Sequence, residues 1–409
     1  MSLPAVESHR TSERIFDRTI FYCLIFVVVS PMFSIAVHSI GFGAALILWA
    51  IKMVVARKWE VCRTPLDYFF LAYAVAEILS TVFSLHPSES LINMKRLLLI
   101  VIVYLSAASL KEEWKIKTLL GTLFCTAAFL SLYEIGNVFI THEPRLNVFQ
   151  HYMTTGGLKM IVSLLILPFI LDEGFSRKLR YALVALFVPI FVALILTQTR
   201  SSWLGFLCGA VVIGIVKNRT FVFAIIGFVV LFIFFAPSTL QHRALSVIDP
   251  HDPSNNLRIR MWETGWRIFC DHPVVGIGDT DIKQTYIQYT TPIDINEGGH
   301  LHNNFVMLAV TLGIIGFSAV MAIFVRVILY EFSVFRKVFA YPLARSIILG
   351  SIAVFIGFQV NGLFEWNFGD QEIAALFWFT IGLAIAIERF TNRTAADEKE
   401  IITVTKKSD

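Results

Sequence analysis

Long apolar stretches dominate the pattern of hydrophobic and polar positions along this chain. About 12 of them have the length of about 17 to 25 residues that a helix needs to cross the hydrocarbon core of a membrane. They begin near Thr19, Ile40, Asp67, Lys95, Ile116, Gly157, Tyr181, Ser202, Thr220, Asn303, Leu343 and Gln371. Because backbone polar groups in lipid must be hydrogen-bonded within their own segment, each stretch predicts a helix. The pattern predicts an all-α, polytopic integral membrane protein with about 12 transmembrane helices.

The composition supports this interpretation. Of the 409 residues, 56% are hydrophobic and only 16% are charged, which is too much apolar surface for one soluble core. Residues 1–18 are polar, and the first apolar run lacks a small-residue cleavage site, so we expect a retained span and not a signal peptide. The 5 cysteines are scattered without CxxC spacing, which makes a disulfide framework or a zinc site improbable. A net charge of +4 gives nucleic-acid binding no support.

The distribution of positive charge predicts the orientation of the chain. Most of the 34 lysines and arginines fall in the two terminal segments and in alternate loops. Since cytoplasmic loops carry an excess of these residues, we expect both termini to be cytoplasmic. The first nine helices would then occupy residues 1–236, and the last three would occupy residues 303–390. A cytoplasmic tail would follow over residues 391–409.

One long polar segment, residues 237–302, separates the ninth and tenth predicted helices and would face outward. Loops of this length inside compact proteins are usually functional or disordered. The aromatic residues of this segment, such as Trp262 and Tyr286, argue against disorder. An amphipathic stretch from Asn255 to Cys270 predicts a short helix within the loop.

Arginines are prominent in this amphipathic stretch. A helix there places two sets of side chains on different faces: Arg258, Trp262, Gly265, Trp266 and Phe269 on one, and Arg260, Glu263 and Arg267 on the other. This pattern predicts a helix on the membrane surface, with its aromatic face toward lipid and Arg258 at headgroup depth. The alternative is that the arginines only anchor the helix by extending to the interface.

Arg200 lies in a turn so short that it must stand at the membrane boundary, between the seventh and eighth predicted spans. Planar, permanently charged guanidinium groups suit bidentate recognition of phosphate. A second interpretation is an interfacial anchor.

His300 and His302 directly precede the tenth predicted span. An HxH pair raises the question of a metal, with Glu297 as a third ligand, although no further histidine or cysteine lies nearby. At the rim of an arginine-rich site, a histidine would instead stay neutral and able to accept a proton. A structural hydrogen bond at the start of a helix is the remaining alternative.

Acidic residues inside apolar spans are expensive and often functional, and Glu77 and Glu134 are two of them. Either could pair with an arginine across the bundle. Glu365 flanks the short outward turn between the last two spans and could line the same cavity as the histidines. The spacing of Gly205 and Gly209 fits a helix-packing motif.

Several motifs together resemble a known family. His302-Asn303, followed after nine residues by Gly313-Ile314-Ile315-Gly316, is similar to the signature of the O-antigen ligase and polymerase superfamily of bacterial inner membranes. Thr199-Arg200-Ser201 with Gly205 looks like its arginine turn. Arg258-xxx-Trp262, followed by Asp271-His272-Pro273 and the Gly276-Ile277-Gly278 segment, resembles the start of its large periplasmic loop. The motifs cover about residues 195–316, and the predicted layout of spans extends the resemblance to the whole chain.

The resemblance implies a glycosyltransferase with an undecaprenyl-diphosphate-linked O-antigen donor and an active site at the periplasmic face of the inner membrane. The form of its His-Asn motif favours a ligase, which transfers the glycan to a sugar hydroxyl of the lipid A core and so completes lipopolysaccharide. An O-antigen polymerase, which joins lipid-linked repeat units, is the alternative. A lipid-linked glycan flippase is a non-enzyme alternative, although its charges would have to line the full width of the bilayer.

The resemblance also implies roles for individual residues. Arg200 and Arg258 would bind the diphosphate, and His302 would take the proton of the acceptor hydroxyl as it attacks the anomeric carbon with inversion. The candidate helpers are Arg260, Arg267, His300 and Asn303. Since guanidinium groups would meet the diphosphate charge, we expect no metal and no cofactor.

Overall fold

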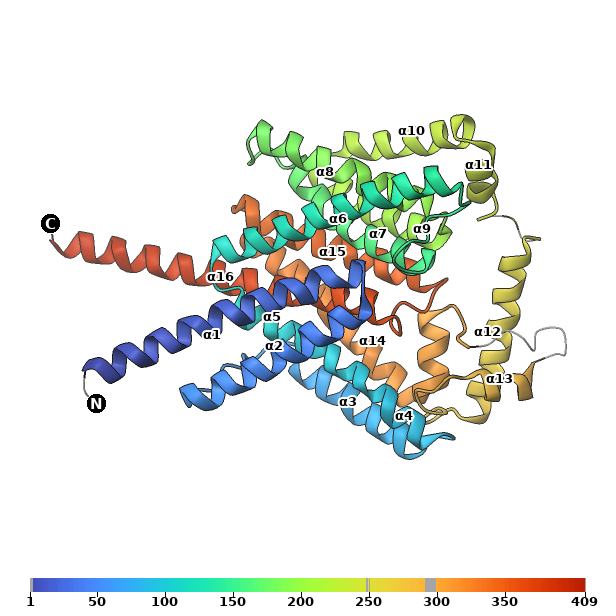
Figure 1. Cartoon of the computed structure of the whole chain (residues 1–409), viewed down its shortest axis with the longest axis horizontal. Coiled ribbons are helices and arrows are strands. Elements are labelled where there is room, and N and C mark those ends of the chain that lie inside the picture. Colours follow the sequence, from blue (N-terminus) through green and yellow to red (C-terminus); the bar gives the residue numbers. More distant parts are fainter. Residues whose placement is uncertain (1–2, 248, 250, 291–298, 409) are drawn as a thin grey trace.

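The computed structural model describes residues 3–247, 249, 251–290 and 299–408, and these residues form an all-helical bundle (Figure 1). In the described chain, ten segments are long and apolar enough to cross a membrane. They lie in α1 (Leu3–Val29), α2 (Ile35–Ala56), the composite of α4 (Pro87–Asn93), η2 (Met94–Ile100) and α5 (Val101–Ser109), α6 (Glu113–Thr141), α7 (Tyr152–Leu171), α8 (Arg177–Leu196), α9 (Arg200–Lys217), α14 (Asn304–Val338), α15 (Pro342–Gly362) and α16 (Gln371–Ser408). The first of them runs on into the short turn η1 (Ser30–Met32). The predicted polytopic all-α fold is confirmed.

Two further predicted spans also form helices but are shorter. Helix α3 (Asp67–Val82) has 16 residues and α10 (Arg219–Phe235) has 17. Each of the predicted apolar stretches therefore coincides with helical structure, and the strict length criterion separates these two from the other ten. Both helices run alongside the longer ones in the bundle (Figure 1).

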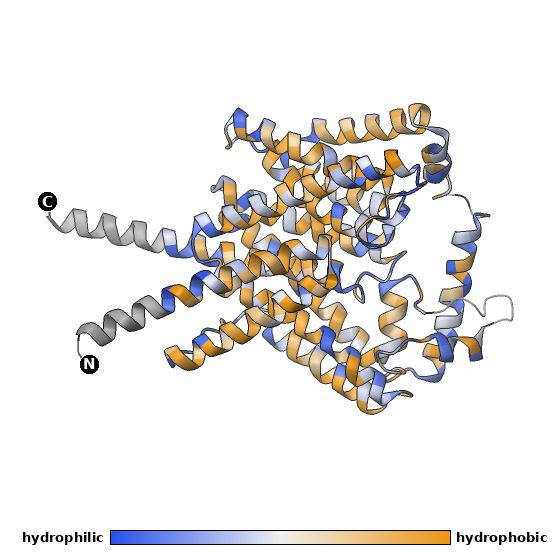
Figure 2. Ribbon diagram, viewed as in Figure 1, coloured by the Kyte–Doolittle hydropathy of each residue, from blue (hydrophilic) through white to orange (hydrophobic). Residues whose placement is uncertain are grey.

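The described residues between α10 and α14 lie at the end of the molecule opposite the two termini (Figure 1). They include α11 (Ser238–Leu245), α12 (Pro253–Asp271) and α13 (Lys283–Tyr289). Helix α12 crosses the ends of the bundle helices, and hydrophilic residues are interspersed along it, whereas apolar residues predominate along the bundle (Figure 2). The short helices predicted in the long loop are present.

Glycine allows α9 and α15 to approach closely in the centre of the bundle. A side chain at Gly205 would meet the backbone oxygen of Gly357, and one at Gly209 would meet the backbone oxygen of Ala353. Without a side chain at these positions, the two helix backbones pack against each other. The packing role predicted for the Gly205 and Gly209 spacing is confirmed, and it fixes the position of Arg200 at the start of α9.

Helix α14 is broken at Gly313, whose φ of 62° and ψ of −168° are accessible essentially to glycine alone. Segment 273–278 docks into this break through four backbone hydrogen bonds of 2.8 to 3.3 Å. A side chain at Gly276 or at Gly313 would overlap the backbone of the opposite segment. Two separate parts of the sequence motif are thus one structural unit, which ties the long loop to a membrane helix.

The acidic residue Glu134 has a partner inside the bundle, but that partner is a lysine. Lys159 on α7 lies 2.7 Å from the Glu134 carboxylate on α6, and both side chains are almost completely buried. The expectation of an arginine partner was wrong, because the residue that faces Glu134 across this helix pair is Lys159. Glu77 is likewise buried, on α3.

Candidate active site

Arg200 is the first residue of α9 and is 6% exposed. Its Nη1 donates hydrogen bonds of 2.8 Å to the backbone oxygen and to the hydroxyl of Ser246. Its Nη2 lies 3.2 Å from Asp252 Oδ1 and 3.1 Å from Ser254 Oγ. The guanidinium therefore holds the segments around α11 and the start of α12 against the start of α9.

Arg258 reaches the same place from the first turns of α12. Its Nη1 donates a hydrogen bond of 3.1 Å to the Ser254 hydroxyl, which also accepts from Arg200. Its Nε is buried and has no hydrogen-bond partner. Asp252 fixes the position of Ser254, because it caps α12 by accepting a 3.1 Å hydrogen bond from the Ser254 backbone N–H. The structure thus brings the two predicted arginines, from different helices, to one hydroxyl.

Positive charge is concentrated around this pair. Burial lowers the pKa of Arg243 to about 10, and the neighbouring Arg200, Arg145 and Arg258 add to this effect. Arg243 donates a 3.1 Å hydrogen bond to the backbone oxygen of Gln198, in the turn that precedes α9. Mutual repulsion among these arginines would be relieved by a ligand with two or more negative charges.

An apolar groove of about 230 Å³ leads away from Arg200. Its walls come from α8, α9 and α10, and Leu245 at the end of α11 also contributes. Among the described residues, Arg200 is the one charged residue that lines the groove. The groove therefore offers an apolar surface to a ligand whose anionic end lies at Arg200.

His302 stands in the left-handed region with a φ of 46°, immediately before α14. On one side, Leu301 is completely buried. On the other side, Asn303 caps α14 by accepting hydrogen bonds of 2.8 and 3.1 Å from two backbone N–H groups of the first turn. The Asn303 amide also donates to the Leu363 backbone oxygen at 3.0 Å. Asn303, predicted as a helper, therefore holds the backbone that carries His302.

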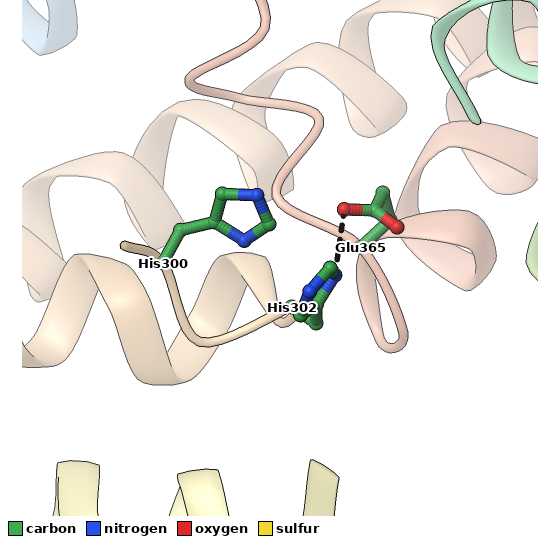
Figure 3. A group of neighbouring side chains, drawn as sticks. All are labelled: His300, His302 and Glu365. Atoms are coloured by element: carbon green, nitrogen blue, oxygen red, sulfur yellow. Dashed lines mark hydrogen bonds and ion pairs between the residues drawn. The ribbon is translucent and has the colours of Figure 1, made fainter. Parts of the chain in front are cut away.

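Glu365 contacts His302 directly. Its Oε1 lies 3.0 Å from His302 Nδ1 (Figure 3). Burial alone raises the pKa of Glu365, but the hydrogen bond from His302 and the influence of the neighbouring His302, His300 and Arg258 outweigh it, so the pKa is lower than usual. An ionised Glu365 accepts from Nδ1–H, which leaves Nε2 of a neutral imidazole as a proton acceptor. The pair has the arrangement of a base and its orienting carboxylate.

His300 lies beside His302, with ring centroids 4.2 Å apart (Figure 3). Burial, and next the charge of His302, lower the pKa of His300 to about 4. His300, His302 and Glu365 offer ligand atoms within 4.8 Å of one another, a grouping that could hold a metal ion. Glu297, the third ligand considered in the sequence, lies outside the described residues. The expected absence of a metal stays a prediction.

The structure does not bring Arg260 and Arg267 to this site. Both lie on the exposed face of α12, and Arg267 donates a 3.3 Å hydrogen bond to the Tyr289 backbone oxygen of α13. Neither residue lines the groove at Arg200 or the cavity at His302. Of the four predicted helpers, His300 and Asn303 lie next to His302.

The predicted orientation of α12 was wrong for most of its aromatic face. The Trp262 indole N–H donates a 3.0 Å hydrogen bond to the Leu301 backbone oxygen. A side chain at Gly265 would collide with Leu301 and Val306. This face packs on the start of α14 instead of facing lipid, because it covers a buried cluster that includes Leu301. Trp266 remains 63% exposed.

A polar cavity of about 670 Å³ opens beside the histidines. His300, His302 and Glu365 form part of its wall, and α4, η2, the start of α7 and the loop before α13 supply residues on its other sides. The arginines of the Ser254 cluster are not among its lining residues. Glu365, the partner of His302, therefore links two environments, because it interacts electrostatically with Arg258 and also lines the polar cavity.

Glu365, Ser254 and Asp252 were not predicted as partners of the site residues. Sequence reasoning placed Glu365 near the cavity, but its partner is 63 residues away along the chain. The signal for Asp252 was the Asp-Pro-Ser start of α12, which is typical of a helix N-terminus. Nothing in that pattern indicates that the cap would also contact Arg200.

Comparison with known proteins supports the motif analysis. A family model described as O-antigen ligase matches residues 185–321, about a third of the 409 residues. This region is similar to that family, and the resemblance noted over about residues 195–316 is confirmed. It contains Arg200, Arg258 and His302, and it ends before Glu365. No curated protein matches the chain significantly.

Proposed function

We propose that this protein is a membrane glycosyltransferase that moves O-antigen polysaccharide from undecaprenyl diphosphate to a sugar hydroxyl of the lipid A core. The similarity of residues 185–321 to the O-antigen ligase family supports a transferase of the ligase or polymerase type. The observation that carries the proposal is the convergence of Arg200 and Arg258 on Ser254, with Arg258 close enough to Glu365, the partner of His302, to interact with it electrostatically.

The donor diphosphate would bind at Arg200 and Arg258. Its oxygens would replace Ser254 and Asp252, which occupy the guanidinium groups in this structure. The unpaired Nε of Arg258 is a further donor for a phosphate oxygen. The first units of the lipid tail would lie in the apolar groove that begins at Arg200.

The reaction needs one proton acceptor and one stabilised leaving group. His302 Nε2 takes the proton of the acceptor hydroxyl, whose oxygen forms a bond to the anomeric carbon. The bond from that carbon to the diphosphate oxygen breaks, and undecaprenyl diphosphate leaves with the electron pair. Displacement in one step inverts the anomeric carbon. Arg200 and Arg258 stabilise the charge that develops on the diphosphate, and Glu365 stabilises protonated His302.

We propose that the site lies outside the cytoplasm. The described ends of α1 and α16 project from one end of the bundle, and the site lies toward the other (Figure 1). If the positive-inside pattern sets the orientation, both termini are cytoplasmic and α12 lies in the periplasm of an inner-membrane protein. Accessibility of single cysteines introduced at exposed positions of α12 to a membrane-impermeant thiol reagent tests this placement, with endogenous exposed cysteines first replaced by serine.

The experiment that tests the function is transfer by the purified protein in detergent or proteoliposomes. The donor is undecaprenyl-diphosphate-linked glycan, and the acceptor is either lipid A core or a second lipid-linked repeat unit. We expect glycosylated lipid A core. Product with only the second acceptor would make the protein a polymerase. Movement of the donor across the bilayer without transfer to either acceptor would contradict the proposal and favour a flippase.

A further inference from the structure

The cavity beside His302 has a charge opposite to that of the arginine cluster. Four carboxyl groups line it, those of Glu89, Asp281, Glu365 and Asp370. Burial raises the pKa of Asp370 and Glu365 is paired with His302, so Glu89 and Asp281 provide most of the negative charge. Among the described residues that line it, Arg96 is the one lysine or arginine. The cavity wall therefore carries mainly carboxyl groups, whereas the arginines gather around Ser254.

The positive charge of Arg96 is already compensated. Its Nη1 lies 2.7 Å from Asp279 Oδ2, and Asp279 is buried behind the cavity wall. Asn93, one turn earlier, donates a 2.9 Å hydrogen bond to the Asp279 backbone oxygen. Arg96 thus ties the long loop to η2, and the charge that the cavity presents to a ligand is set by the carboxylates.

Polar atoms in the wall lack partners. Thr280 is 3% exposed, and its hydroxyl has no hydrogen-bond partner. Glu365 is 7% exposed, and its Oε2 is likewise unpaired, since Oε1 makes the contact with His302. Buried polar atoms are normally hydrogen-bonded, so these two atoms leave hydrogen-bonding capacity in the wall that a polar ligand could use. A ligand rich in hydroxyl groups could supply both donors and acceptors here.

We infer that this cavity binds the terminal sugar of the acceptor, and that this sugar carries no phosphate. The inference rests on the proposed transferase function. Carboxylates accept hydrogen bonds from sugar hydroxyls, whereas they repel phosphate. The segregated charges would direct the diphosphate donor to the arginines and an uncharged sugar to the other side of His302, which would set the direction of transfer.

Glu89 is suited to a test because it lines the cavity from α4 and is only partly buried. Its Oε1 accepts a 2.8 Å hydrogen bond from the Asp281 backbone N–H, which a glutamine oxygen could still accept. Glu89→Gln therefore removes charge with little structural change, and Glu89→Lys reverses it. Glu143 provides the matched control, since it is exposed in the loop before α7 and does not line the cavity.

The experiment compares two soluble probes, a hexose-terminated core oligosaccharide and the same oligosaccharide with a 6-phosphate on its terminal hexose. Binding to the purified protein and initial transfer rates with saturating donor are both measured. We expect the neutral probe to bind at least about tenfold more tightly than the phosphorylated one. Glu89→Gln should weaken neutral-probe binding and raise the acceptor KM, while the donor KM stays unchanged.

Charge reversal gives a result that misfolding cannot imitate. Glu89→Lys should improve binding of the phosphorylated probe relative to the neutral one, whereas Glu143→Lys should leave the ratio unchanged. Equal use of both probes by the wild-type protein, or no change in the ratio with Glu89→Lys, would overturn the inference. Selective binding of the neutral probe without any transfer would instead contradict the proposed function and leave the cavity assignment standing.

Discussion

The two ends of helix α9 hold charged clusters of different kinds. At the Lys217 end, Asp172 is 1% exposed and pairs with Lys217 and with Arg345, whose Nε and Nη2 each donate at 2.6 Å. At the Arg200 end, several arginines gather around Asp252, and Arg258 keeps an unpaired nitrogen.

The difference separates a structural cluster from a candidate binding site. Both oxygens of Asp172 are satisfied by side chains of α9 and α15, so the cluster is complete without a ligand. Around Arg200 the positive charge is in excess, and a groove and a cavity lie nearby. An arginine in a charged cluster therefore indicates a binding site only after the carboxylates that already pair with it have been taken into account.

The largest effect on activity is expected at His302. His302→Ala removes the proton acceptor and should reduce the transfer rate about a hundredfold or more. His300→Ala should retain substantial activity, because Glu365 orients His302 and not His300. Initial rates of both variants, at matched amounts of folded protein, provide the test. Wild-type turnover of His302→Ala would show that another group is the base.

Lysine substitutions at the arginine pair come next. Arg200→Lys and Arg258→Lys keep the charge but lose the planar fork, and each should slow transfer about tenfold or more. Their effects should be non-additive in the double variant, since both residues act on one diphosphate. Arg267→Lys, on the exposed face of α12, is the control. If both single variants transfer at near-wild-type rates, the arginines are membrane-boundary anchors.

At the other end of α9, a substitution should affect stability and not chemistry. Asp172→Asn leaves Lys217 and Arg345 without their carboxylate, which should cost about 3 kcal/mol of stability. The melting temperature of the purified protein should fall, while the activity of the folded fraction at low temperature is unchanged. A loss of activity with an unaltered melting temperature would mean that this cluster takes part in catalysis.

The pH dependence of that stability follows from the same contacts. Burial alone raises the pKa of Asp172, but hydrogen bonds from Arg345 and Lys217 outweigh it and hold the pKa well below its usual value. The contribution to stability is therefore present above the ordinary aspartate pKa of about 4 and is lost as the pH falls toward the lowered value. Melting curves of wild type and Asp172→Asn should converge in acid.

The smallest expected effect is that of a chelator. His300, His302 and Glu365 could hold a metal ion, yet the proposed reaction needs none, because guanidinium groups meet the diphosphate charge. Transfer rates with and without EDTA should agree within error. Loss of activity in EDTA that one specific metal restores would assign a metal to these three residues.

Much of this architecture could be predicted from local sequence. Hydropathy located the helices, and short motifs singled out Arg200, Arg258 and His302 as candidates, because each of these signals lies within a few residues. Interactions between distant segments could not be derived in that way. The contact of Glu365 with His302 joins the segment that follows α15 to the segment that precedes α14. Hydrophobic periodicity contains no information about such pairs.

The orientation of α12 shows a second limit of local patterns. An aromatic face on an amphipathic helix is equally suited to lipid and to protein. Only the buried Leu301 and the close approach at Gly265 decide that this face packs on α14. Gly313 belonged to a motif noted in the sequence, but neither the helix break there nor its partner, segment 273–278, was predicted, and both became clear only from the structure.

The central claim is that the arginines at one end of α9, which outnumber their carboxylate partner Asp252, bind the diphosphate. It is tested most directly by binding of undecaprenyl diphosphate. Affinities are measured for purified wild type, Arg258→Lys and Arg345→Lys, each first shown to be folded at the temperature used. We expect Arg258→Lys to weaken binding about tenfold or more and Arg345→Lys to leave the affinity unchanged. Unchanged affinity for Arg258→Lys, or equal losses for both variants, would contradict the claim.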